Sequence, residues 1–324
     1  MRSCGAQTTG GPRGAAVGFG LWRAAATAPA MLCSLLLVAV ATSGLHPWKA
    51  PVLLVWVGCG AVGLTRAGER VAVRVAFGFR PPSAAQAAAL QPLWAAALRL
   101  SATPVGEVDL YVQRSRQPNA YAAGGRSVAV TSRALEDYRA ARLAAEQMVA
   151  VLVHELGHHA TRATQPMLVA MWLAAPWRMA ARLLTGLAGV LSGRPSQRAV
   201  RTVVTAGIAV AGVRAMQQGH WMVGGVLGAL ALLAVICPLA DAAVCRRAEF
   251  AADRFTADHG LGPELATALR TLNDGSNAAA GWSRRLLAPH PTPERRISAL
   301  LTPAPAGPHT DRLTSANAVS SACP

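Results

Sequence analysis

Long apolar segments with few charges constrain this chain more than any other feature of its sequence. Of its 324 residues, 52% are hydrophobic and 14% are charged, whereas an ordinary soluble domain carries about 25% charged residues. A run of about 20 apolar residues is long enough to cross a bilayer as a helix. The composition therefore excludes a disordered chain, a collagen and a coiled coil, and it predicts a membrane protein.

The apolar runs predict two transmembrane hairpins, at residues 28–64 and 199–244, and thus about four transmembrane helices. A cleaved signal peptide is an alternative interpretation of the first run, 28–45, because basic residues precede it. A second apolar run follows after only a few residues around Lys49. The hairpin is therefore the favoured interpretation.

A third apolar stretch, residues 167–191, is predicted to lie on the membrane surface. It carries Arg178 and Arg182 one helical turn apart near its middle. Each arginine would cost about 2.5 to 3.5 kcal/mol at the centre of the bilayer. We therefore assign residues 167–198 to an amphipathic segment at the interface.

The remaining sequence divides into two tails and the two parts of one water-facing domain. The tails are residues 1–27, predicted to be cytoplasmic, and 302–324, which are rich in Pro, Ser, Thr and Ala and predicted to be disordered. The domain consists of residues 65–166 and 245–301.

Within the first part of this domain, residues 107–113 and 127–131 alternate as strands do, and Gly124-Gly125 marks a tight reversal between them. Residues 135–161 form one or two helices. The expected fold is mainly α with a small antiparallel β-sheet.

A formal net charge of +16 raises the alternative of nucleic-acid binding. The arginines recur beside the apolar runs instead of gathering on one helix, as the positive-inside bias of membrane proteins predicts. With 167–198 at the interface, only Lys49 and Arg214 fall on the opposite side of the membrane, so the water-facing domain is predicted to be cytoplasmic. The six cysteines show no disulfide spacing, which fits a reducing compartment.

The motif His154-Glu155-Leu156-Gly157-His158 carries the chemistry. On a helix, residues i and i+4 lie on one face, one turn apart, so both imidazoles can bind one metal ion. Glu155 is rotated away from the pair and is placed to act as general base toward a metal-activated water. The adjacent His159 is about 100° around the helix and cannot share that face.

A hydrolytic zinc site needs a third protein ligand, and Glu249 is the best candidate. Glu249 and Asp253 are spaced i, i+4, so Glu249 could bind the metal while Asp253 accepts a hydrogen bond from a ligand histidine. Acidic pairs at this spacing are also common on solvated helix faces, and the spacing alone leaves both interpretations open. Glu249 can meet His158 only if an even number of transmembrane spans separates them.

Taken together, these motifs resemble the M48 membrane metallopeptidases, the HtpX and Ste24 group. The resemblance rests on HELGHH, on EFAAD after two apolar spans, on the segment that begins with Asn119, and on the His290-Pro291 element with Arg295. It implies a gluzincin fold that holds one Zn²⁺ per chain. Its implied zinc ligands are His154, His158 and Glu249, with Glu155 as catalytic base.

Further roles are implied by the same resemblance. His290 would help to stabilise the oxyanion, and Arg295 would orient carboxylates. An extended substrate would lie near the segment Asn119, Ala120, Tyr121 and Ala122.

The predicted function is a membrane-embedded zinc metalloendopeptidase that hydrolyses peptides or membrane proteins, with quality control as the role that the resemblance suggests. The competing interpretation is a catalytically inactive zinc-binding sensor or scaffold. Structural zinc sites are more often closed by four Cys or His ligands, and the presence of Glu155 argues for the enzyme.

Overall fold

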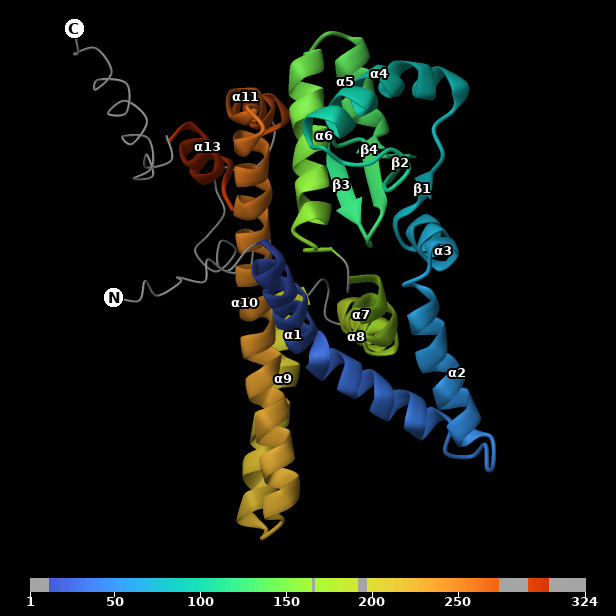
Figure 1. Ribbon diagram of the computed structural model, residues 1–324. Coiled ribbons are helices and arrows are strands. Elements are labelled where there is room, and N and C mark those ends of the chain that lie inside the picture. The colour runs from blue at the N-terminus through green and yellow to red at the C-terminus, as the bar shows by residue number, and fades with distance from the viewer. Residues whose placement is uncertain (1–11, 165–166, 192–196, 274–290, 303–324) are drawn as a thin grey trace, which may run out of the picture.

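A computed structural model describes residues 12–164, 167–191, 197–273 and 291–302 (Figure 1). The molecule is mostly helical with one small sheet, as expected. The sheet and its covering helices lie at one end, and paired helices extend away from them at the other (Figure 1). The predicted disordered tail 302–324 lies almost wholly outside the described residues.

The apolar runs form α1 (Pro12–Ala41), α2 (Lys49–Val62), α9 (Gln197–Gln217) and α10 (Trp221–Asp258). Helix α1 begins inside the predicted tail 1–27. Among the described residues, two helices, α1 and α10, are long and apolar enough to cross a membrane, or three if α2 and the next helix count as one bent span. The expected four spans are therefore not reached, because α2 is only 14 residues long and the apolar part of α9 only covers Thr202–Gln217.

Helix α10 connects the apolar end of the molecule to the sheet domain without a break. The predicted domains place a boundary between residues 244 and 245, but α10 crosses it and runs continuously for 38 residues, through Pro238, from Trp221 to Asp258. Helix α9 packs along its first part, and the two extend together away from the sheet (Figure 1). The last part of α10 packs against helix α6, which is described below.

The stretch predicted to lie at the interface forms α7 (Met167–Leu173) and α8 (Ala175–Leu191). Both helices pack against α1. The indole of Trp172 donates a hydrogen bond to the carbonyl of Trp56 on α2 (2.8 Å), and the amide of Trp177 donates to the Ser34 hydroxyl on α1 (3.0 Å). In Figure 1 the two helices lie across the direction of α10.

The sheet has four strands, β1 (Phe79–Arg80), β2 (Asp109–Gln113), β3 (Ala120–Ala123) and β4 (Ser127–Thr131), in the order β1-β2-β4-β3. The pairs β1–β2 and β3–β4 are antiparallel, but β2–β4 is parallel. The expectation of an antiparallel sheet is therefore wrong. The chain leaves β2, returns along the outer edge as β3 and reverses at Gly124 (φ +61°), so β4 inserts between them in the direction of β2.

Helices α4 (Ala84–Leu100), α5 (Ser132–Arg139), α6 (Ala145–Ala160), α11 (Gly262–Asn273) and α13 (Pro293–Leu301) complete the domain. Helix α6 packs against α4, α11 and β3. Leu152, Val153 and Leu156 on α6 are almost fully buried in the main hydrophobic core. The core thus fixes the rotation of α6 about its axis.

Candidate metal centre

Two histidines from α6 face the same point. His154 and His158 are one turn apart and buried, and their ring centroids are 4.9 Å apart with the rings nearly perpendicular. The side chain of Gln147 caps the start of α6 by accepting a hydrogen bond from the Ala144 amide (3.0 Å). The predicted pairing of the two imidazoles on one helix face is therefore present.

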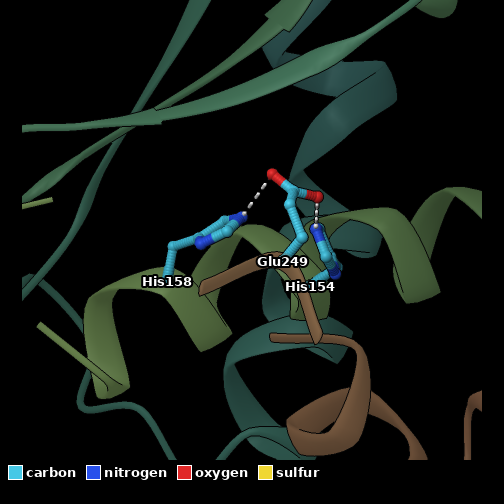
Figure 2. A group of neighbouring side chains, drawn as sticks. All are labelled: His154, His158 and Glu249. Carbon is cyan, nitrogen blue, oxygen red and sulfur yellow. Dashed lines mark ion pairs between the residues drawn. The ribbon is translucent and has the colours of Figure 1, made fainter. Parts of the chain in front are cut away.

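Helix α10 brings Glu249 between these imidazoles. One carboxylate oxygen of Glu249 lies 3.5 Å from Nε2 of His154, and the other lies 3.6 Å from Nε2 of His158 (Figure 2). The three side chains each offer a ligand atom within 4.8 Å of the others. The structure thus places the two histidines of α6 next to a carboxylate that is far from them in the sequence.

The close approach of α6 and α10 depends on Gly157, which lies between the two histidines. A Cβ atom there would meet a ring carbon of Phe255 at 3.1 Å and the Cα of Ala252 at 3.2 Å. Both Phe255 and Ala252 belong to α10, and the Cα of Ala252 is a backbone atom. A side chain at Gly157 would therefore push the two ligand-bearing helices apart.

The donor set fits zinc. The distances of 3.5 and 3.6 Å are long for hydrogen bonds. They are close to the roughly 3.3 Å that separates two ligand atoms bound tetrahedrally to one zinc at about 2.0 to 2.1 Å. Two imidazoles and one carboxylate are a common ligand set of catalytic zinc sites. Burial lowers the pKa of His158 to about 3, which favours the neutral imidazole that a metal requires. Although burial opposes it, interaction with Asp253 and Glu249 raises the pKa of His154 to about 9, so metal binding there would release a proton.

Glu155 is buried beside this group but is not one of its three members. Burial raises the pKa of Glu155 to about 6, which is close to the range in which a carboxylate exchanges protons at neutral pH. The backbone of Ala122 on β3 lies close enough to this carboxylate to favour its charged form and partly offset the rise in pKa. Glu155 therefore lies between the ligand group and the outer strand of the sheet.

Asp253 and Arg296 support the ligand residues from behind. Asp253 Oδ1 lies 3.1 Å from Nδ1 of His154, on the ring side opposite Glu249. Arg296 donates two hydrogen bonds to Asp253 (2.9 and 2.6 Å), and its Nη1 lies 3.0 Å from Oε2 of Glu249. The carboxylates thus share one buried guanidinium, whose Nη2 also lies 3.2 Å from Nε2 of His154. Arg296 therefore contacts Glu249, Asp253 and His154 directly and orients them.

Arg295, the residue expected to orient carboxylates, does not reach this group. Its side chain is exposed on α13, whereas that of Arg296 is buried. Adjacent residues on a helix differ by about 100° in direction. The buried arginine that contacts the carboxylates is therefore Arg296, one position after the predicted Arg295. Leu300, four residues after Arg296, packs against the core, and this i, i+4 relation is the sequence signal that could have identified Arg296. His290 lies outside the described residues.

His159 lies apart from the ligand group. Its Nε2 is 3.2 Å from the carbonyl oxygen of Ser127, and its Nδ1 is 3.4 Å from the Thr164 hydroxyl. It thus connects α6 to the start of β4.

The segment expected to contact substrate begins at Asn119 and forms β3, which is an edge strand. The carbonyl of Asn119 accepts a hydrogen bond from Thr131 on β4 (3.0 Å). Because partners alternate along an antiparallel ladder, Ala120 and Ala122 direct their backbone groups to the open edge. The Asn119 side chain accepts from the Ala120 amide (2.9 Å), and the Tyr121 side chain is 36% exposed.

Comparison with known proteins supports the same assignment. Residues 84–304, more than half of the chain, match the model of peptidase family M48. The chain belongs to this family. It is thus a member of a metallopeptidase family, and its long apolar helices make it a membrane protein.

Six chains of solved structures match this M48 protein. One is described as the crystal structure of S. mikatae Ste24p, with 15% sequence identity and a TM-score of 0.43. That match covers 82% of this chain and 61% of the other, so the M48 protein described here spans less than two thirds of its length. No curated protein gives a significant match.

Replacing Arg296 by glutamine is expected to lower zinc affinity about 10- to 100-fold, because the partners that orient metal ligands have effects of this size. Competition with a fluorescent zinc chelator would measure the change. Arg295→Gln is the matched control on the same helix and should leave affinity unchanged. Equal effects of the two substitutions would contradict the role assigned to Arg296.

Proposed function

We propose that this protein is a zinc metalloendopeptidase with a single zinc bound by His154, His158 and Glu249. The observation that carries the proposal is the convergence of these three buried ligand atoms within 4.8 Å, with the buried Glu155 beside them. When bound, zinc would act as a Lewis acid that activates a water molecule and polarises the scissile carbonyl. The protein supplies three ligands and not four, which would leave one coordination position for water or substrate.

Glu155 would act as the general base and then as the general acid. Its carboxylate accepts a proton from the attacking water and returns it to the leaving amine. The raised pKa of about 6 favours both steps, since the group gives up and accepts a proton near neutral pH. Arg296 and Asp253 are positioning residues, which act through Glu249 and His154.

The substrate would bind in an extended form along β3. Ala120 and Ala122 direct backbone groups toward the open edge, and the backbone of Ala122 also lies close to Glu155. An added strand would therefore run past the base. The neighbouring strand β4 lies between β2 and β3 and has no free edge. Pairing through backbone groups selects little sequence, which suits a protease for varied or misfolded membrane proteins.

The zinc domain is proposed to face the cytoplasm of a cell-membrane protein. In the topology predicted from the sequence, only Lys49 and Arg214 fall on the side opposite the zinc domain, and the positive-inside rule would then assign that domain to the cytoplasm. A role in membrane-protein quality control is suggested by the resemblance to the HtpX and Ste24 group, and low sequence selectivity would suit it.

Removal of the metal tests the proposal. Dialysis of the purified protein against a strong chelator is expected to abolish cleavage of casein, and stoichiometric Zn²⁺ is expected to restore it. Peptide release would be followed by fluorescence of labelled casein. Cleavage that continues in protein shown by mass spectrometry to be free of metal would exclude the mechanism. Zinc binding without any cleavage would support the inactive sensor.

A further inference from the structure

Helix α3 (Arg66–Phe77) follows the apolar helix α2 at a bend of 95°. It carries four charged residues in 12, namely Arg66, Glu69, Arg70 and Arg74. That charge density is too costly for the interior of a bilayer. A place at the membrane surface, beyond the bend that ends the apolar helix α2, therefore suits α3 better than a place inside the bilayer.

The rotation of α3 about its axis is fixed by a buried carboxylate. Glu69 is 4% exposed and accepts hydrogen bonds from the amides of Gly125 (3.0 Å) and Arg126 (2.8 Å) and from the Ser127 hydroxyl (2.7 Å). Val73, one turn later, is fully buried. These contacts hold one face of α3 against the β3–β4 turn.

The opposite face of α3 is apolar and uncovered. Val71 is 61% exposed and Val75 is 82% exposed. They are one turn apart and point about half a turn away from Glu69. A helix whose outer face met only water would carry polar residues there. Val62 and Leu64, at the end of α2, are also more than half exposed, so the apolar surface continues from a membrane helix onto α3.

Arginines line one flank of this apolar face. Arg70 pairs with Asp109 at 3.0 Å, and Arg66 donates to the backbone carbonyls of Gly106 and Glu107, so both also tie α3 to the domain. Arg74 is exposed one turn further along. Apolar side chains flanked by basic ones are typical of helices that lie among phospholipid headgroups.

We propose that α3 lies in the membrane–water interface, with Val71 and Val75 among the lipids and the guanidinium of Arg74 beside headgroup phosphates. The expectation that residues 65–166 face only water would then be wrong for this helix. Because Glu69 joins its inner face to the β3–β4 turn, the edge strand beside the metal centre is held at a fixed height above the bilayer.

A site-specific fluorophore tests this placement. The full chain, with its six cysteines replaced, would carry a single environment-sensitive label at Val75→Cys and would be reconstituted in phospholipid nanodiscs. The matched control is Glu146→Cys, an exposed position at the start of α6, which is the end farthest from α9 and from the first part of α10 (Figure 1). We expect the label at position 75 to emit at shorter wavelength and to lose emission when lipids with spin-labelled acyl chains are included.

Quenching at position 75 that is no stronger than at position 146 would overturn the proposal. A blue-shifted label that the lipids do not quench would also overturn it, because a second copy or another part of the chain would then cover the face. Neither measurement depends on peptidase activity, so failure here is distinct from failure of the proposed function.

Discussion

Glu155→Gln is expected to lower the rate of casein cleavage by about 100- to 10,000-fold, the range that a positioned general base contributes. The amide has nearly the shape of the carboxylate but cannot accept the proton of the attacking water. Zinc content should remain at that of the unaltered protein, because the three ligand atoms come from other residues. Turnover of labelled casein, normalised to zinc measured by mass spectrometry, would quantify the loss.

The matched control for this substitution is Glu146→Gln. Glu146 lies on the same helix but is exposed at its first turn. It should retain full activity. An undiminished rate for Glu155→Gln would remove Glu155 from the mechanism, and a lost activity accompanied by lost zinc would instead indicate a role in metal binding.

The local part of the site could be predicted from sequence because it depends on one helix. On any regular α-helix, the four-residue spacing of His154 and His158 places both side chains on the same face, one turn apart. The position of Glu155 beside them follows in the same way. These inferences need no knowledge of how the chain packs.

The remainder depends on packing that the residues do not encode locally. Arg295 and Arg296 are adjacent and chemically identical, so only the burial of α13 decides which reaches Asp253. The insertion of β4 between β2 and β3 is a property of the whole sheet, and a strand pattern with a tight reversal is equally compatible with a simple hairpin. The sequence did not predict that α10 is one continuous helix. Its composition changes from apolar to charged at Cys245, but the helix does not end there.

The convergence of Glu249 with the histidines required a topological argument. An even number of spans between α6 and the last part of α10 allows them to meet on one side of a membrane. The pairing of α9 with the first part of α10 returns the chain to the side of α6, although of these two helices only α10 is long and apolar enough to count as a span. Gly157 then permits the close contact, a requirement that becomes visible only when Phe255 and Ala252 lie against it.

Glu249→Ala is expected to reduce zinc affinity severely and to abolish cleavage. The substitution leaves two imidazoles, which is one ligand fewer than a catalytic zinc site normally has, and it removes one of the two carboxylates that share the buried Arg296. Because loss of a buried partner can also destabilise the fold by about 3 to 5 kcal/mol, circular dichroism must show that the variant is folded. Glu249→Gln, which keeps the shape and an oxygen, serves as the second variant if it is not.

The most direct test of the three-residue site is the zinc content of folded protein dialysed against buffered free Zn²⁺. The control is Asp258→Ala, which removes an exposed acidic residue from the same helix. We predict about one zinc per chain for the unaltered protein and for Asp258→Ala, and little or none for folded Glu249→Ala or Glu249→Gln. Full zinc occupancy with unchanged affinity in both Glu249 variants would contradict the assignment of this distant carboxylate as the third ligand.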